Sequence, residues 1–170
     1  ATLRPEAASC CYTLQGVKSA REWRLGGSMK LVKHLLDRKG GEIVSIVAEA
    51  SVLEAIKLMA DRTVGSLLVM DGENLNGIVT ERDYARKVIV KGRSSESTQV
   101  GEIMTTELYT AKPDQTVNEC MTVVTERRIR HLPVVENGKV IGIISIGDLV
   151  EAIISDQREE IEQLEQYISG

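Results

Sequence analysis

Two short segments of the sequence place a hydroxyl residue three positions before an aspartate. Thr80 precedes Asp83, and Ser145 precedes Asp148. A carboxylate in this position can accept hydrogen bonds from both vicinal hydroxyls of a ribose. The hydroxyl and the first N–H groups of a following helix can hold a phosphate or ribose oxygen. The same spacing is also ordinary helix capping, so a single pair has two interpretations.

The two segments belong to an internal repeat with an offset of 65 residues. Residues 51–83 align without a gap with residues 116–148, a self-similarity that indicates a duplicated structural unit. The identical pairs are Val52/Val117, Glu54/Glu119, Arg62/Arg127, Leu67/Leu132, Val69/Val134, Gly77/Gly142, Ile78/Ile143 and Asp83/Asp148. Because the pairs fall at the same structural steps, the two aspartates are equivalent positions of the repeat.

Each copy predicts a helix, two strands joined by a tight turn, and a second helix. Ser51 with Glu54, and Thr116 with Glu119, have capping-box spacing before an apolar helical face. Asp71-Gly72 and Asn137-Gly138 are good hairpin turns. The predicted strands are Ser66–Met70, Leu75–Thr80, His131–Val135 and Val140–Ser145, with shorter β-like segments at Glu42–Val47 and Leu108–Lys112.

This order predicts a mixed α/β (α+β) fold of two β-α-β-β-α repeats. One copy is too small to bury its sheet alone, so the two are expected to pack sheet to sheet. The predicted parts are a basic N-terminal extension with a short helix (1–40), repeat 1 (41–98), repeat 2 (99–156) and a C-terminal helix extension (157–170).

The last helix is predicted to run on to about Ile168. Its apolar residues, Ile154, Ile161, Leu164 and Ile168 among them, follow a 3-4 spacing. These apolar residues either cover the core of the same module or form a short dimer seam with a second copy of the chain. The polarity of residues 155–167 favours the seam.

Charge and composition exclude several classes of function. Residues 1–40 hold eight Lys/Arg against three Asp/Glu, whereas the rest of the chain is acidic. An acidic body is a poor match for nucleic acid, whose phosphates need a basic face. The basic start is interpreted either as a solvated tail or as the remainder of a removed transit peptide. No apolar run approaches the roughly 20 residues of a membrane span.

The cysteines and histidines offer little catalytic or metal chemistry. Cys10, Cys11 and Cys120 are a poor disulfide framework, which favours a reducing intracellular compartment. With only His34 and His131 beside them, no metal site is expected. Hydrolase, metalloprotease and P-loop motifs are missing from the sequence, so an enzyme is not expected. Cys120 is interpreted as inert core.

Three segments resemble signatures of tandem cystathionine-β-synthase (CBS) domains. They are Gly77–Asp83 (GIVTERD), its counterpart Gly142–Asp148 (GIISIGD) and Arg130–Val135 (RHLPVV). The resemblance covers about residues 40–155. It implies two repeats related by a pseudo-two-fold axis, two symmetry-related clefts and a homodimer. More narrowly, the chain is similar to plant single-pair CBS proteins of mitochondrial type, which implies redox homeostasis through adenosine ligands and thioredoxin.

The resemblance also implies which residues share each cleft, because each combines the Asp motif of one repeat with the leading and central strands of the other. The first cleft is expected to contain Thr80, Arg82, Asp83, Tyr109, Thr110, Ala111, Arg130 and His131. The second is expected to contain Val44, Ser45, Ile46, Gly65, Ser66, Ser145 and Asp148. Gly77 and Gly142 allow close backbone approach beside the motifs. His131 is interpreted either as a hydrogen-bonded structural residue or as a ligand contact.

The two clefts are expected to differ in charge. Two guanidiniums and a histidine in the first suit a nucleotide phosphate. The second has no comparable cation among its predicted residues. We therefore expect a phosphorylated adenosine, AMP above all, in the first cleft. The second is expected to be empty or to take a neutral nucleoside or an S-adenosyl compound.

The favoured function is a non-catalytic regulatory module. Its adenosine ligand would change the orientation of the repeats or of the dimer and so modulate a partner such as thioredoxin. The expected location is the mitochondrion, or otherwise another reducing intracellular compartment. The alternative is a structural module without ligand, in which the Asp motifs only cap helices and the C-terminal helix mediates dimerisation or binds a partner.

Overall fold

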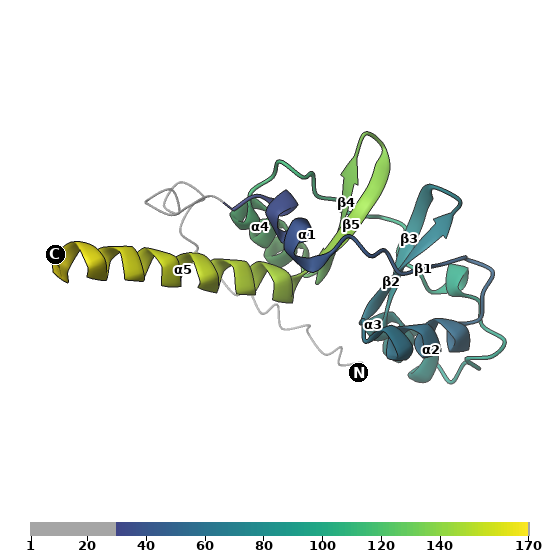
Figure 1. Ribbon diagram of the computed structural model, residues 1–170. Coiled ribbons are helices and arrows are strands. Elements are labelled where there is room, and N and C mark those ends of the chain that lie inside the picture. The colour runs from purple at the N-terminus through teal and green to yellow at the C-terminus, as the bar shows by residue number, and fades with distance from the viewer. Residues whose placement is uncertain (1–29, 170) are drawn as a thin grey trace, which may run out of the picture.

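The computed structural model describes residues 30–169 and consists of two similar halves with one long projecting helix (Figure 1). In chain order the elements are α1 (Val32–Lys39), β1 (Ser45–Ile46), α2 (Val52–Arg62), β2 (Ser66–Asp71), β3 (Asn74–Thr80), α3 (Glu81–Tyr84), η2 (Ala85–Ile89), η3 (Val100–Glu102), α4 (Val117–Arg127), β4 (His131–Glu136), β5 (Lys139–Ser145) and α5 (Ile146–Ser169). The predicted mixed α/β fold of two repeats with a long C-terminal helix is confirmed. Cys10, Cys11 and most of the predicted N-terminal extension lie outside the described residues.

Each half is built around an antiparallel hairpin, and the two hairpins stand side by side (Figure 1). The registers are equivalent, since Ser66 pairs with Thr80 and His131 pairs with Ser145. Each hairpin therefore places the end of its second strand, where the hydroxyl–Asp motif begins, beside the start of its first strand.

The leading strands of the two repeats differ. In the first repeat β1 pairs in parallel with β2, and the Leu68 N–H donates to the Val44 carbonyl oxygen at 3.2 Å. In the second repeat the predicted strand 108–112 is reduced to a single parallel bridge between Ala111 and Val134. The equivalent of Leu68 is Pro133, which has no N–H to continue the ladder. This prolyl residue explains why the predicted strand does not form.

The predicted capping boxes start the main helices. Ser51 Oγ accepts from the Glu54 N–H at 3.2 Å, and Glu54 Oε2 accepts from the Ser51 N–H at 2.8 Å. The Thr116–Glu119 pair repeats this arrangement at the start of α4. Apolar side chains at equivalent positions on α2 and α4 are buried, as the periodicity predicts: Val52, Ala55 and Met59, and Val117, Cys120 and Val124.

The core of each repeat is completed by a segment from before, or from the start of, the other repeat. Helix α1 lies before the first repeat but buries Val32, Leu35 and Leu36 in the core of the second. The segment around η3 lies at the start of the second repeat but buries Val100 and Ile103 in the core of the first. Full burial of such side chains contributes about 1.5–3 kcal/mol each. This exchange fixes α1 against β5 and the start of α5.

Two glycines were predicted to allow a close approach to the backbone. The segments that approach them are α1 and the residues just after η3. Gly77 faces Met104 and Thr105, and Gly142 faces Leu36. Both glycines therefore serve packing between protein segments. Among residues 30–169, no helix is both long and apolar enough to cross a membrane.

Candidate functional site

A hollow of about 240 Å³ lies between the two repeats, where the end of β3 faces the start of β4. Six of the eight residues predicted for the first cleft line it: Thr80, Arg82, Asp83, Tyr109, Arg130 and His131. They come from three separate places in the chain, residues 80–83, 109 and 130–131. The fold thus brings the Asp motif of repeat 1 to the leading segment and the central strand of repeat 2.

The other two predicted residues of the first cleft do not line the hollow. Thr110 is exposed, and Ala111 is 1% exposed within the core of the second repeat. The Ala111 N–H donates to the Pro133 carbonyl at 2.9 Å, and the Ala111 carbonyl accepts from the Val135 N–H at 2.9 Å. Both backbone groups are thus engaged by the bridge to β4.

The Asp83 carboxylate is held by the cap of α3. Its Oδ2 accepts from the Thr80 hydroxyl at 2.7 Å and from the Thr80 N–H at 3.0 Å. Its Oδ1 pairs with Lys87 Nζ at 2.8 Å, one turn further along the chain. Lys87 also donates to the Ile103 carbonyl at 2.6 Å. Capping therefore fixes the carboxylate at the hollow, and Lys87 holds the oxygen that the cap does not use.

Charged side chains of both signs, from both repeats, line the hollow. Arg82, Arg128 and Arg130 line it, against the carboxylates Glu81, Asp83 and Glu107. Arg128 closes α4 in the left-handed conformation, with φ of 53°, which turns the chain back towards the hollow. Guanidiniums are well suited to bidentate recognition of phosphate.

Burial and neighbouring charges affect two further side chains of the hollow, His131 and Tyr109. Burial is the main cause that lowers the pKa of His131 below its ordinary value, and the charge of Lys39 acts in the same direction. The histidine is therefore neutral at pH 7 and offers one donor and one acceptor. The Tyr109 ring is covered by the Arg127 guanidinium, 4.8 Å from the ring centroid, a favourable cation–π geometry.

The second Asp motif has the same cap but a different cation. Asp148 Oδ2 accepts from the Ser145 N–H at 2.6 Å and from the Ser145 hydroxyl at 2.9 Å. The same oxygen lies 2.8 Å from Lys39 Nζ at the end of α1. Burial opposes ionisation of Asp148, but the hydrogen bonds from Lys39 and Ser145 outweigh it and lower the pKa of the carboxyl. The prediction that this cleft lacks a cation is wrong, because α1 supplies one from outside the repeats.

The remaining residues predicted for the second cleft belong to the first repeat. Val44 and Ile46 pack on the core of the first repeat, Ser45 is exposed, and Ser66 is 8% exposed. Gly65 lines the hollow beside Asp83 instead. The hairpin register explains the position of Gly65, because the Glu81 N–H donates to the Gly65 carbonyl oxygen at 3.2 Å within the same repeat.

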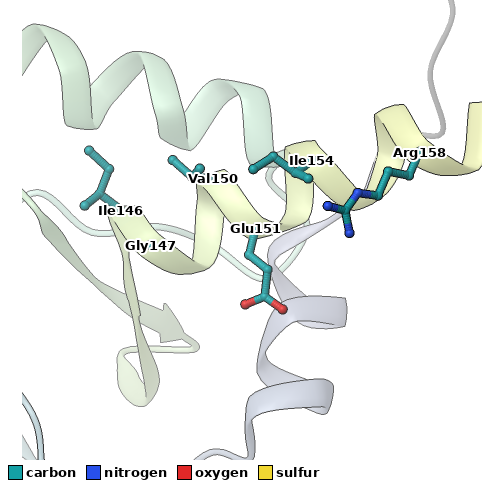
Figure 2. A pocket seen from close by; sticks show the side chains of 6 residues that line it. All are labelled: Ile146, Gly147, Val150, Glu151, Ile154 and Arg158. Carbon is teal, nitrogen blue, oxygen red and sulfur yellow. The ribbon is translucent and has the colours of Figure 1, made fainter.

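A second, more open hollow of about 520 Å³ lies along the start of α5 (Figure 2). Its lining is Ile146, Gly147, Val150, Glu151, Ile154 and Arg158. Figure 2 shows Ile146, Val150 and Ile154 along one side of the helix and Glu151 on the other. The hollow has no hydroxyl–carboxylate pair, so its chemistry suits an apolar contact better than a nucleoside.

Metal and thiol chemistry find no support in the part of the chain that the structure describes. Within residues 30–169, no cluster of three or more His, Cys, Asp or Glu side chains is placed to hold a metal ion. Cys120 is 1% exposed, and burial raises the pKa of its thiol to about 11. It is a packing residue of α4 rather than a nucleophile.

Three basic residues of the two motifs were not found by sequence reasoning. Lys87 carried a usable signal, since it follows Asp83 at i+4, the spacing of helical ion pairs. Arg128 follows a predicted helix, where a basic residue is ordinarily explained by the helix dipole. Lys39 carried no local signal, because it lies 109 residues before its partner Asp148.

A duplicated β-α-β-β-α unit with a hydroxyl–Asp motif at each strand-to-helix junction defines a tandem repeat module. The family model of the CBS domain matches residues 32–89 and 100–155, and the chain belongs to the CBS domain family. The resemblance noted in the sequence is therefore confirmed.

The chain is similar to CBSX3, a mitochondrial CBS domain-containing protein of Arabidopsis thaliana. The two are 39% identical over 94% of this chain and 82% of the relative. A solved CBS-domain structure from Burkholderia ambifaria MC40-6 has a TM-score of 0.73 and 50% identity, over 75% of this chain and 96% of that one. The CBS domain pair of the protein MJ0100 has a TM-score of 0.67 and 25% identity, over 75% and 98%. Its crystal structure is a complex with 5′-methylthioadenosine and S-adenosyl-L-methionine.

Proposed function

We propose that this CBS domain pair is a non-catalytic regulatory module that binds an adenosine-type ligand, AMP above all, in the hollow beside Asp83. The observation that carries the proposal is the convergence of Thr80, Asp83, Arg130 and His131, from two different repeats, on one hollow. If Thr80 and Asp83 served only to cap α3, residues of the second repeat would not be needed beside them.

The chemistry of the hollow matches the parts of a nucleotide. The ribose hydroxyls would donate to Asp83 Oδ1 in place of Lys87, and the phosphate would bind Arg82, Arg128 or Arg130. The volume of about 240 Å³ is below the range of about 300–1,000 Å³ for small-molecule pockets, so the phosphate would lie at the rim. The adenosine compounds bound by the MJ0100 pair support this class of ligand.

The ligand would act on the relative position of the two repeats, since its contacts come from both. A ligand shifts an equilibrium only by its differential affinity for the two states, and a hollow between repeats supplies such a difference. By similarity to the mitochondrial CBSX3, the proposed setting is the mitochondrion, with thioredoxin as the proposed partner in redox homeostasis.

The proposed assembly is a homodimer formed through α5. The helix projects from the body, as Figure 1 shows, and Ile161 and Leu164 are 54% and 55% exposed. Ile154, Ile161, Leu164 and Ile168 lie on the 3-4 spacing of a two-helix seam. The same face is the observation that favours the second candidate function, an interaction module without ligand.

Ligand titration of the full chain, with a substitution that separates capping from binding, tests the function. Asp83→Asn keeps an oxygen for the cap but removes the charge that a ribose requires. AMP at a hundred times its dissociation constant should stabilise the wild type by about 2.7 kcal/mol, and this gain should be lost in Asp83→Asn. Asp61→Asn, on the exposed face of α2, is the control and should keep it.

The opposite result would favour the interaction module. If no adenosine compound changes the thermal stability of the wild type, the adenosine-sensor proposal is wrong. Truncation after Ser155 should then abolish dimer or partner binding while Asp83→Asn leaves it intact. Pull-down and sedimentation of the two variants distinguish the candidates.

A further inference from the structure

The Asp83 carboxylate is shared between a helix cap and a lysine. Its Oδ2 accepts from the Thr80 hydroxyl at 2.7 Å and from the Thr80 N–H at 3.0 Å, which completes the cap of α3. Its Oδ1 lies 2.8 Å from Lys87 Nζ, and the Asp83 side chain, 14% exposed, lines the hollow between the repeats. Because the cap already fills the acceptor sites of Oδ2, a further donor from the hollow is directed to Oδ1 and meets Lys87 there.

Lys87 owes its position to an unusual turn of the backbone. It lies in η2, a turn of π-helix that directly follows α3. The Val90 N–H donates to the Ala85 carbonyl oxygen at 3.0 Å, the i→i+5 bond that defines such a turn. Turns of this kind are rare and often occur at functional sites. This one brings Val88, the fifth residue after Asp83, into the core at 0% exposed.

The second motif shows the regular alternative. Asp148 lies in α5, which is α-helical over Ile146–Ser169. The fourth residue after it is Ala152, which is 1% exposed and packs in the core of the second repeat. In the first motif the fourth residue is Lys87, 37% exposed, because the π turn moves the core position to the fifth. The π turn thus releases the position beside the carboxylate for a lysine.

Lys87 also has a second acceptor. Its Nζ donates to the Ile103 carbonyl oxygen at 2.6 Å, in the segment around η3 that packs on the first repeat. The chain continues from there to Thr105, which bridges to Ile78, and on to Tyr109. Thr105 and Tyr109 line the hollow. If Lys87 leaves Oδ1, it still has the Ile103 carbonyl as a partner, so the displacement costs less than the loss of both contacts.

We propose that Lys87 is a specificity-determining residue of the site beside Asp83, where it competes with the ribose hydroxyls of the ligand for Oδ1. A ligand with a vicinal diol must move the ammonium group before it binds the carboxylate. A ligand without the diol leaves the ion pair in place. Lys87 thereby limits how strongly the site prefers a ribose over a sugar that lacks hydroxyls. This inference rests on the proposed function, because it concerns the same ligand and the same hollow.

The size of the effect follows from the partly exposed ion pair. Such a pair leaves the open state as a minor population of roughly one in five, and the apparent affinity for a diol falls by that fraction. Removal of the Lys87 charge should therefore strengthen adenosine binding about fivefold. Because salt screens the ion pair but not an uncharged ligand, higher ionic strength should act in the same direction.

Isothermal titration of the full chain with adenosine and with 2′,3′-dideoxyadenosine tests the inference. Both probes are uncharged, so the loss of a lysine does not act on a phosphate. Lys87→Met removes the charge and keeps the length of the side chain. It should tighten adenosine binding about fivefold and leave the binding of 2′,3′-dideoxyadenosine unchanged. A change in the ratio of the two affinities is a readout that a merely structural role of Lys87 would not move.

Three variants control the measurement. Lys87→Arg keeps the charge and should retain the wild-type ratio of the two affinities. Arg86→Met is the matched control, because Arg86 is the neighbouring residue, is exposed and does not line the hollow. Adding Asp83→Asn to Lys87→Met should abolish the gain, since the two residues act through one contact. Melting curves of each variant confirm that the fold is retained.

Salt gives a second readout without a change of sequence. Between about 0.05 M and about 0.5 M salt, adenosine binding to the wild type should strengthen, and Lys87→Met should lose this dependence. Binding of 2′,3′-dideoxyadenosine reports any effect of salt on the hollow itself, and its dependence should be the same in both proteins.

The failures of the two proposals are distinguishable. If adenosine binds the wild type through Asp83 but Lys87→Met gives no gain, or weakens binding, the competitor role is wrong and the proposed function stands. An equal gain for both probes would overturn the competitor role in the same way, because the substitution would then act on the shape of the hollow. If adenosine binds none of the variants, the adenosine ligand is wrong and the competitor role falls with it.

Discussion

Leu36 of α1 lies directly against Gly142 of β5, so that a Cβ at Gly142 would come within 2.7 Å of Leu36 Cδ2. The two residues are 106 positions apart, and Leu36 precedes the first repeat although it packs in the second. The missing side chain at Gly142 lets α1 approach the hairpin. The same helix carries Lys39 to Asp148, so this contact also positions the cation of the second motif.

Alanine at either of the two equivalent glycines of the repeat, Gly77 and Gly142, should destabilise the fold. Gly142→Ala forces Leu36 to move, at a cost of about 1–3 kcal/mol. Gly77→Ala should cost more, because the added methyl group would lie 2.9 Å from the backbone oxygen of Thr105, which has less freedom than a side chain. Urea unfolding followed by circular dichroism measures both changes.

Gly147→Ala is the control for these substitutions. The nearest atom to its added methyl group is Ser145 Oγ at 3.5 Å, an ordinary contact in the first turn of α5. Loss of glycine's freedom in the unfolded chain should stabilise the protein by about 0.5–1 kcal/mol. Wild-type stability of Gly142→Ala would contradict the packing role of that glycine.

The pKa of His131 predicts a loss of stability in mild acid. Burial lowers the pKa in the folded state, whereas the unfolded chain keeps a value of about 6.5. Between the two values the unfolded state binds more protons, so the free energy of unfolding rises with pH. The contribution of His131 is fully present above about pH 6.5 and is lost as the pH falls through the folded pKa.

His131→Gln should flatten this acid limb of the stability curve. The comparison uses the slope of the free energy of unfolding between about pH 7 and pH 5, which is independent of any packing change from the substitution. Chemical denaturation at several pH values measures it. An unchanged slope in His131→Gln would show that another group titrates in this range.

Cys120 should be unreactive in the folded protein. Its thiol is 1% exposed, and a pKa of about 11 leaves almost no thiolate at pH 7. In a Cys10→Ser/Cys11→Ser variant, labelling with a thiol reagent should be slow under native conditions and rapid in denaturant. Rapid native labelling would show that α4 opens locally, and its rate would measure that opening.

Charged residues on the exposed face of α5 should weaken the proposed dimer. Ile161→Lys or Leu164→Lys should raise the dissociation constant at least about tenfold, because each places a charge in the proposed apolar seam. Gln163→Lys lies off the seam and serves as the control. Sedimentation velocity over a range of concentrations gives the constants, and a monomeric wild type would contradict the dimer itself.

Much of the local structure was predictable because its causes are local. The Ser51–Glu54 and Thr116–Glu119 spacings determine where α2 and α4 begin, and the apolar periodicity determines the buried faces. The 65-residue repeat predicts two equivalent hairpins, and their registers agree. Six of the first-cleft residues were likewise predictable, since two copies of one motif and a family resemblance define their places.

The second cleft could not be predicted in the same way. Its residues were assigned by symmetry with the first cleft, but the lysine beside Asp148 comes from α1, 109 residues earlier in the chain. Gly65 follows the register of its own hairpin into the first hollow. The repeat pattern does not reveal contacts of this kind, because they form between residues that lie far apart in the chain.

The sequence by itself determined the duplicated fold and the hydroxyl–Asp motifs, because capping, periodicity and turn chemistry act over a few residues. Only the tertiary structure decided which segment completes which core and which lysine neutralises which aspartate. Those choices depend on packing between residues that lie far apart in the chain. Leu36 against Gly142 and Lys39 against Asp148 are such pairs, joined because α1 crosses from the start of one repeat to the core of the other.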